Sequence, residues 1–305
     1  NRGIAVFNDG FRPIVPQFYD GQISRKELAT MSFAISFGLV IGFAIPTSIA
    51  ASIILIHCVL LTTDIIGTFC PDSLVGTVIA GVVGAAYGVA ILLGLESIVN
   101  LFGSLPFNFL ANLGSVSSYI TAAFAIFPAV AVGYQHGFKK GAVAGLITLV
   151  VYLLTVKFGK FAVGEAKVAL NGFGMAMLAG MVCLLVFATG VKGTGDANSS
   201  LVTTFGDKVK RIRSNWWLLA IMGGLVAMAT SLGIVAGDPI SLGLVSEGSW
   251  AEAAMVALAR AIGFIPLVFT TAIVTGVYGP AGSTFVFVVG LLLHGNPFVA
   301  VVAGA

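Results

Sequence analysis

Apolar segments long enough to cross a lipid bilayer recur along this chain. A helix needs about 20 residues to cross the hydrocarbon core, and residues 73–95, 116–134 and 251–276 each provide roughly that length with few charges. Only 9% of all residues are charged and 58% are hydrophobic, whereas an ordinary globular domain carries about 25% charged residues. We therefore predict an all-α, polytopic transmembrane protein in which residues 1–305 form a single transmembrane domain.

Other segments of the same character extend this prediction. Further spans are expected at residues 25–57, 141–156, 168–188, 216–235 and 280–293. The first of them should begin at Arg25, because Ser24 and Glu27 have the spacing of a helix capping box, and it should bend at Pro46. The chain lacks an initiating Met and stops inside an apolar run, so we expect a natural protein that is longer at both ends.

Lysine and arginine are concentrated on one side of this predicted topology. The polar loop at residues 189–215 carries Lys192, Lys208, Lys210, Arg211 and Arg213. Cytoplasmic loops of membrane proteins are enriched in such residues. This pattern predicts a multi-pass protein of the bacterial inner (plasma) membrane with a cytoplasmic 189–215 loop and a short acidic loop at residues 238–247 outside. The same distribution gives no indication of nucleic-acid binding.

The least regular apolar stretch is residues 97–114. It contains Pro106, Asn108 and Asn112, and non-helical backbone is tolerated at membrane depth only where it lines protein or water. We therefore predict a re-entrant hairpin or a broken helix there. Residues 10–15 also resemble residues 263–268, an internal similarity of the kind found in transporters built from two related halves.

Arg260 is the most unusual residue of the apolar segments. It lies inside the 251–276 run, where a cation costs a few kcal/mol or more unless it faces a protein interior, a partner or a water-filled cavity. Gly263 and Pro266 follow it closely and loosen the helical hydrogen bonding. Two interpretations stay open. Arg260 is either part of a substrate or ion pathway, or one half of a structural ion pair between two helices.

Asp64 is the natural counter-charge for Arg260. It follows Thr63 in a segment that should lie in or near the membrane, where a lone carboxylate binds a proton or finds a cation. Asp9 and Arg12 offer further pairings with each other or with Arg260. A titrating carboxylate fits coupling to H⁺, whereas Thr63 and Asp64 together fit coupling to Na⁺. The alternative for Asp64 is a helix cap or a loop carboxylate at the membrane surface.

Neutral polar side chains complete the set of candidate binding residues. Asparagine and serine in unwound backbone suit a polar ligand or the carboxylate of a small acid, whereas in a regular helix they serve close packing. Threonines four residues apart share one helix face. The residues concerned are Asn108, Asn112, Ser115, Ser117, Ser118, Thr271 and Thr275. The three histidines lie at predicted span ends and are interpreted as membrane-surface residues.

Signatures of catalysis and metal binding are not found in the sequence. It contains no nucleophile elbow, phosphate-binding loop or zinc-protease motif, and Cys58, Cys70 and Cys183 follow no ligand spacing. We therefore expect no enzymatic activity, no metal site and no bound cofactor beyond a coupling ion.

Short motifs, several containing charged residues, run in order along nearly the whole chain. They lie at residues 8–14, 63–67, 113–118, 123–128, 134–135, 260–267, 270–272, 275–278 and 296–297. In these motifs the sequence resembles the YhfT family of bacterial inner-membrane proteins, which has no assigned activity. The resemblance implies a longer C-terminus and an expectation of transport without a substrate. It adds Gln135 to the candidate binding residues, whereas His57 and Glu96 lie outside its pattern.

These observations predict a membrane transporter, or permease, for a small polar or anionic metabolite, coupled to an ion. A phosphotransferase-type permease subunit or a channel is the first alternative. A non-transporting membrane scaffold is the second, and its mark would be a charge network with no accessible cavity beside it. The expected partners are the small-molecule substrate and the lipid bilayer, with a homodimer as a further option.

Overall fold

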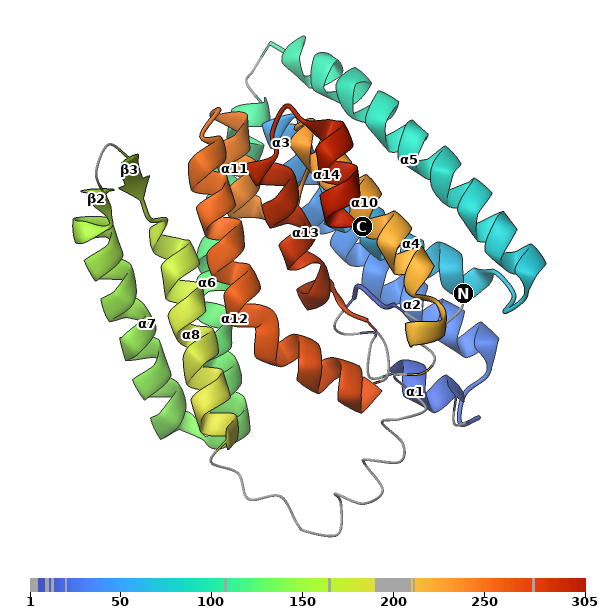
Figure 1. Cartoon of the computed structure of the whole chain (residues 1–305), viewed down its shortest axis with the longest axis horizontal. Coiled ribbons are helices and arrows are strands. Elements are labelled where there is room, and N and C mark those ends of the chain that lie inside the picture. The colour runs from blue at the N-terminus through green and yellow to red at the C-terminus, as the bar shows by residue number, and fades with distance from the viewer. Residues whose placement is uncertain are drawn as a thin grey trace.

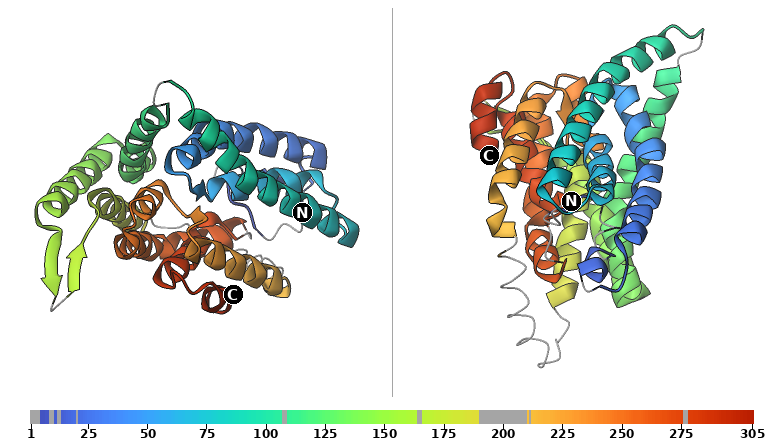
Figure 2. Two further views of the ribbon diagram at one scale, coloured as in Figure 1. Left: turned by 90° about the horizontal axis from the view of Figure 1, so that it is seen from above. Right: turned by 90° about the vertical axis from the view of Figure 1, so that its right-hand side faces the viewer.

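The computed structural model describes residues 5–8, 11, 14–19, 21–106, 109–163, 166–189, 210, 212–275 and 278–305, and over residues 109–121 and 266–275 it describes the backbone alone. The described chain is almost entirely helical. Figures 1 and 2 show helix α5 along one edge of the molecule, with α7 and the hairpin β2–β3 at the opposite edge. The predicted all-α class is confirmed.

The N-terminal third consists of helices that are interrupted by a short strand. Helix α1 spans Ile14–Tyr19 and α2 spans Arg25–Leu39, where the capping box predicted at Ser24 and Glu27 is confirmed. One π-helical turn, η1 (Val40–Ala44), leads into α3 (Ile45–Ala51). The predicted continuation of this helix to residue 57 is wrong. Ser52 takes a positive φ of 55°, which ends the helix before strand β1 (Ile54–Leu55) and helix α4 (His57–Phe69).

The next two helices are longer than the sequence indicated. Helix α5 spans Leu74–Gly103, so it runs past Glu96, and α6 spans Phe109–His136 with Pro128 inside it. The predicted interruption of residues 97–114 is present, because the described residues 104–106 lie in a turn. This turn joins two long helices, however, so the expectation of a separate re-entrant segment is not met.

Helices α6, α7 and α8 pack against one another as a group. Helix α7 spans Phe138–Phe158 and α8 spans Gly172–Thr189. Between them an antiparallel hairpin pairs β2 (Lys160–Val163) with β3 (Ala166–Ala169), with Lys160 opposite Ala169. Residues 190–209 and 211 of the expected cytoplasmic loop lie outside the described residues.

The C-terminal third contains the second interrupted element. Helix α10 (Trp216–Ser231) ends four residues earlier than predicted, and strand β4 (Val235–Ala236) follows it. The predicted loop at residues 238–247 is wrong, because helix α11 occupies Pro239–Ser246. The predicted segments 251–276 and 280–293 are confirmed as the helices α12 and α13, and α14 completes the fold. Their bounds are Trp250–Thr275, Pro280–Leu292 and Pro297–Gly304.

The two short strands lie in the largest hydrophobic core of the described residues. Strand β1 pairs in parallel with β4, with Ile54 opposite Val235 and Leu55 opposite Ala236. All four side chains are buried together with Phe287 of α13. The strand pair therefore joins the two interrupted elements inside the protein, where burial of apolar surface stabilises their contact.

Several helices have the length and hydrophobicity of membrane spans. Among the described residues, three stretches are long and apolar enough to cross a membrane, namely Arg25–Ala51, Leu74–Ser97 and Phe138–Phe158. Other described helices are apolar but shorter, and those that begin at His57 and Trp216 each adjoin one of the paired strands β1 and β4. This composition is consistent with a membrane protein.

Close packing between α10 and α13 predicts a sensitive position at Gly290. A Cβ atom there would lie 2.5 Å from Cβ of Thr230 and 2.7 Å from the carbonyl oxygen of Ala227. We expect Gly290→Ala to lower stability by about 1–3 kcal/mol through overpacking, measured as a lower thermal unfolding midpoint in detergent. Gly81 on α5 is the matched control, because its Cβ would meet nothing within 4 Å. An unchanged midpoint for Gly290→Ala would contradict this packing.

Candidate functional site

Two helix–strand–helix elements with the same local geometry meet in the core. One is α3–β1–α4 and the other is α10–β4–α11. The first helix of each ends at a residue with positive φ, Ser52 (55°) and Gly233 (72°). The next residue donates its backbone N–H to the carbonyl oxygen five residues earlier. Ile53 donates to Ser48 (3.3 Å) and Ile234 donates to Ala229 (3.0 Å). Both helices thus end in a Schellman-type motif that turns the chain into a strand.

Parallel pairing brings the second halves of both elements together. Ile54 N–H donates to the Ile234 carbonyl and Ile56 N–H donates to the Ala236 carbonyl, each at 2.9 Å. Because the strands run in the same direction, α4 and α11 begin at the same edge of the pair. The pairing ends at Ile56, the cap residue of α4, which has helical backbone angles, whereas Asp238 at the cap of α11 is extended. The N-termini of two helices, which carry partial positive charge, therefore lie close to each other.

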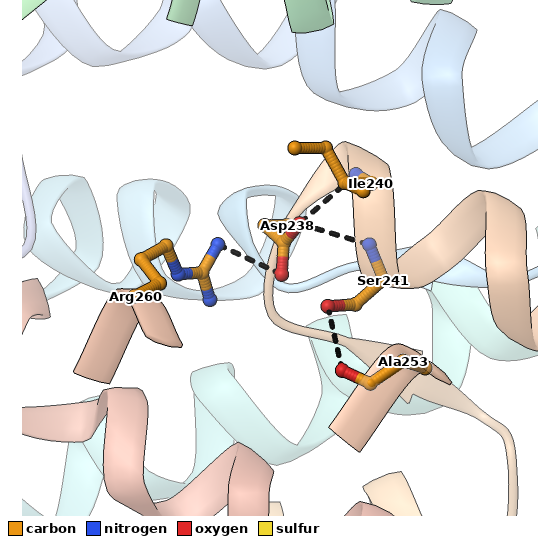
Figure 3. Close-up of polar contacts among 5 residues, drawn as sticks. All are labelled: Asp238, Ile240, Ser241, Ala253 and Arg260. Carbon is orange, nitrogen blue, oxygen red and sulfur yellow. Dashed lines mark hydrogen bonds and ion pairs between the residues drawn. The ribbon is translucent and has the colours of Figure 1, made fainter. Parts of the chain in front are cut away.

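Asp238 connects one of these helix starts to Arg260. Its Oδ1 accepts hydrogen bonds from the N–H groups of Ile240 and Ser241, both at 2.9 Å, and so caps α11. Its Oδ2 lies 2.8 Å from Nη1 of Arg260. Figure 3 shows Asp238 between the start of α11 and the guanidinium on α12, where it contacts one nitrogen of the fork. The carboxylate is thus shared between a helix N-terminus and a cation.

This ion pair is buried and incompletely hydrogen-bonded. The side chains of Arg260 and Asp238 are 8% and 6% exposed. Within the described part of the chain, Nε of Arg260 has no hydrogen-bond partner, and Oδ2 of Asp238 accepts no aligned hydrogen bond although it makes the ion pair. A second link between α11 and α12 is the Ser241 hydroxyl, which donates to the Ala253 carbonyl at 3.4 Å. Buried donors and acceptors are nearly always paired, so these two incompletely hydrogen-bonded atoms make the ion pair unusual.

His57 is the first residue of α4. Its imidazole lies edge-on to Phe43, with ring centroids 5.5 Å apart. The Nδ1 atom is buried and has no partner among the described residues. The sequence assigned His57 to the membrane surface, whereas the structure buries its Nδ1 atom and packs its ring against Phe43.

Asp64 belongs to a different place in the protein. Its Oδ2 accepts hydrogen bonds from the backbone N–H groups of Phe7 (2.9 Å) and Asn8 (2.8 Å). The amide of Asn8 then donates to the Ser36 hydroxyl at 3.0 Å, and Val6 N–H donates to the Tyr278 carbonyl at 2.8 Å. Asp64 is therefore an anchor for the N-terminal segment 5–8.

The predicted pairing of Asp64 with Arg260 is not the one that forms. The structure gives Arg260 an ion pair with Asp238, while Asp64 holds Phe7 and Asn8. Thr63 lies beside Asp64 and donates its hydroxyl to the Leu60 carbonyl of its own helix at 2.7 Å. Sequence reasoning missed Asp238, although an Asp directly before a Pro is a recognisable helix start.

The structure describes the remaining predicted site residues only in part. Gln135 is exposed in the last turn of α6. Asp9, Arg12 and Asn108 lie outside the described residues. The others lie on the helices α6 and α12 at positions whose side chains are not described, namely Asn112, Ser115, Ser117, Ser118, Thr271 and Thr275.

Two cavities of different size lie away from the ion pair. One of about 320 Å³ is lined by Arg213, Trp216 and Tyr278 with parts of α13 and α14. A smaller one of about 60 Å³ is lined by Thr63, Asp64 and the N-terminal segment. Within the described ranges, no three histidine, cysteine, aspartate or glutamate side chains cluster in a way that could hold a metal ion.

The described structure defines a helical protein with membrane-compatible helices, two paired interruptions and a buried ion pair that links one of them to α12. Comparison with known proteins then identifies the family. The family model for YhfT, described as a protein of unknown function, matches residues 1–305. The chain is 35% identical over 321 residues to the uncharacterized protein YhfT of Escherichia coli K12, and the match covers 100% of this chain and 71% of that protein. The chain belongs to the YhfT family. No solved structure matches it.

Proposed function

We propose that this protein is a multi-pass transporter of the bacterial inner membrane for a small polar or anionic metabolite, coupled to an ion. The observation that carries the proposal is the pairing of two interrupted helical elements beside the buried Arg260–Asp238 pair. Interrupted helices are costly in a membrane and persist where they line a substrate or ion site. An ionisable residue at membrane depth has the same significance.

We further propose that the chain is built from two related halves. Both elements, α3–β1–α4 and α10–β4–α11, contain a Schellman-type helix end, a short strand and a new helix start. In each, the residue with positive φ (Ser52 or Gly233) lies two residues before the first paired strand residue (Ile54 or Val235). Many carriers place their binding site where two such repeats meet. The segments related in this way are not the ones that resemble each other in sequence, which are residues 10–15 and 263–268.

A non-transporting scaffold is the competing proposal. It is favoured by one observation, namely that the residues lining the two cavities described above do not include Arg260 or Asp238. A transporter accounts for this if the structure represents an occluded state, in which the site is closed from both sides. The two proposals differ in what a conservative change at Arg260 does.

Uptake into proteoliposomes tests the proposal directly. Labelled organic acids, sugars and phosphonates are offered to vesicles that contain the wild type, Arg260→Lys or the control Lys139→Arg at an exposed position that lines neither cavity. Lysine keeps the charge but loses the planar fork of donors. We expect Arg260→Lys to insert and fold but to transport roughly tenfold more slowly, which corresponds to about 1.4 kcal/mol in the barrier. The control should transport normally.

The structural alternative predicts a different result. A merely structural pair would leave uptake by Arg260→Lys close to that of the wild type. If no substrate class is taken up by well-folded wild-type protein, the transport proposal is wrong.

A further inference from the structure

The buried carboxylate of Asp64 holds the N-terminal segment 5–8 by its charge. Its Oδ2 accepts the backbone N–H groups of Phe7 and Asn8 at 2.9 and 2.8 Å, and the residue is only 6% exposed. Hydrogen bonds to an ionised acceptor are about twice as strong as those to a neutral one. The strength of this attachment therefore depends on whether Asp64 is ionised.

The same segment is also attached to the junction between α12 and α13. Val6 donates its N–H to the carbonyl of Tyr278 at 2.8 Å, and Ala5 forms a parallel bridge with that residue. Tyr278 lies three residues after the end of α12, the helix that carries Arg260 of the buried ion pair. Residues 5–8 are thus a strap that joins α4 to the end of α12, and Asp64 is its attachment point on α4.

A small cavity beside the strap gives water access to Asp64. Its volume is about 60 Å³, which is enough to hold a water molecule. Its lining includes Asp64, Val6 of the strap and Tyr19, whose side chain is 41% exposed. Water in this cavity would connect the buried carboxylate with the protein surface, and protons could reach Asp64 by that route.

Arg25 of α2 is the cation that lines this cavity together with Asp64, among the described residues. Its Nη2 donates to the carbonyls of Gly67 (3.3 Å) and Cys70 at the end of α4. The titratable groups on the other packed elements are Tyr19 of α1 and Tyr87 of α5, whose hydroxyl accepts a hydrogen bond from Thr62 at 3.0 Å. Asp9 and Arg12 lie outside the described residues.

These surroundings favour a proton over a metal ion as the ligand of Asp64. A metal cation needs several oxygen ligands around it, but Oδ2 faces two N–H donors and a guanidinium lines the adjoining cavity. No histidine, cysteine, aspartate or glutamate cluster that could hold a metal ion occurs within the described ranges. A proton needs only one lone pair of the carboxylate.

We propose that Asp64 is the binding site of the coupling ion, that this ion is a proton, and that its binding releases the strap from α4. The inference rests on the proposed function and specifies its coupling ion. The proton competes with the N–H groups of Phe7 and Asn8 for one carboxylate. The strap is therefore bound when Asp64 is ionised and released when Asp64 is protonated, and its release frees the end of α12.

Hydrogen exchange of the strap amides at different pH values tests this competition. The purified full chain in detergent is used, and the protection of Phe7 and Asn8 is expressed relative to the intrinsic exchange rate at each pH. From about pH 8 to about pH 5, a range in which buried carboxylates titrate, this protection should fall about tenfold. Asp64→Asn should show the lower protection at every pH, because its side chain is neutral like the protonated carboxyl group.

Two controls show whether the response belongs to Asp64. Asp72 is an exposed carboxylate just beyond α4, and Asp72→Asn should keep the full pH response of the wild type. The hairpin β2–β3 lies at the edge of the molecule away from the strap (Figure 1). Its amides should keep their protection over the same pH range, which distinguishes release of the strap from a general loss of structure.

Uptake into proteoliposomes tests the coupling itself. A pH gradient across the membrane should accelerate uptake of a labelled substrate by the wild type. Asp64→Asn should still exchange substrate between equal concentrations on both sides, because this exchange needs no net proton movement, but the gradient should not accelerate its uptake.

The outcomes separate this inference from the transport proposal. Strap protection that is unchanged down to about pH 5, or that falls equally in Asp64→Asn, would overturn the proton site even if a substrate is taken up. A pH response that Asp64→Asn abolishes, without uptake of any substrate, would support the site and overturn transport. Uptake that a sodium gradient drives and a pH gradient does not would overturn the inference and leave transport standing.

Discussion

Arg260→Ala should destabilise the protein by about 3–5 kcal/mol, because removing one member of a buried ion pair leaves the other charge without compensation. The stranded group is Asp238, whose side chain is only 6% exposed. It keeps its hydrogen bonds to Ile240 and Ser241, so we expect the lower part of that range. The measurement is thermal unfolding in detergent, followed by tryptophan fluorescence together with the yield of inserted protein.

Variants of Asp238 separate the ion pair from the helix cap. Asp238→Asn retains an oxygen that can cap α11 but leaves Arg260 unpaired, whereas Asp238→Ala loses both functions. The alanine variant should be less stable than the asparagine variant by about 1 kcal/mol, which is a typical contribution of an N-cap. Glu247, the exposed carboxylate at the other end of α11, is the control, and Glu247→Ala should change stability by no more than about 0.5 kcal/mol.

A double variant provides the decisive comparison for the pair. Replacement of a buried ion pair by well-packed hydrophobic residues of similar volume is often neutral or stabilising, and Asn at position 238 keeps an oxygen for the cap of α11. Arg260→Met combined with Asp238→Asn should therefore recover most of the stability that either single change loses. Losses that simply add in the double variant would show that the two side chains do not interact.

Asp64→Ala should release the N-terminal segment from the body of the protein. The carboxylate accepts N–H groups from Phe7 and Asn8 at 2.9 and 2.8 Å, and a hydrogen bond to a charged group contributes about 1.5–3 kcal/mol. We expect the two amides to exchange with solvent deuterium about 100-fold faster, as loss of roughly 2.7 kcal/mol implies. Peptide-resolved exchange measured by mass spectrometry detects this change.

Two comparisons define what the Asp64 result means. Asp64→Asn keeps one acceptor oxygen without the charge and should give an intermediate exchange rate. Asp72→Ala removes an exposed carboxylate just beyond α4 and should leave the exchange of residues 5–8 unchanged. If Phe7 and Asn8 stay protected in Asp64→Ala, another group anchors the segment and our assignment is incorrect.

Features that depend on residues close in the sequence were predictable. The capping box at Ser24 and Glu27 is confirmed because its two hydrogen bonds link residues three apart. The bounds of α12 and α13 also agree with the apolar runs to within one residue. In both cases the local pattern and the tertiary environment favour the same structure.

The breaks at Ser52 and Gly233 were not predicted, and their positions explain why. A serine with positive φ is uncommon, and nothing near Ser52 in the sequence indicates one. The apolar residues on either side fit a continuous helix equally well. The break is stabilised by the pairing of Ile54 with Val235 and Leu55 with Ala236, which joins segments that are far apart in the sequence.

The partner of Arg260 is likewise determined by contacts between segments that are distant in the sequence. From the sequence alone, Asp64 in an apolar segment was the better candidate, while Asp238 stood in an expected surface loop. Strand pairing buries Asp238 and brings it to α12, and the N-terminal segment occupies Asp64 instead. A charge in an apolar chain must find compensation, but the choice among carboxylates depends on which segments meet.

By itself the sequence therefore determined the helical class, the membrane-compatible hydrophobicity, several helix ends and the need for a buried partner for Arg260. These properties follow from composition and from contacts between residues a few positions apart. Only the tertiary structure decided that Asp238 is this partner and that the start of α11, which Asp238 caps, lies beside α12. The physical reason is that these contacts exist only after β1 and β4 have paired, and packing of the whole core, not local preference, stabilises that pairing.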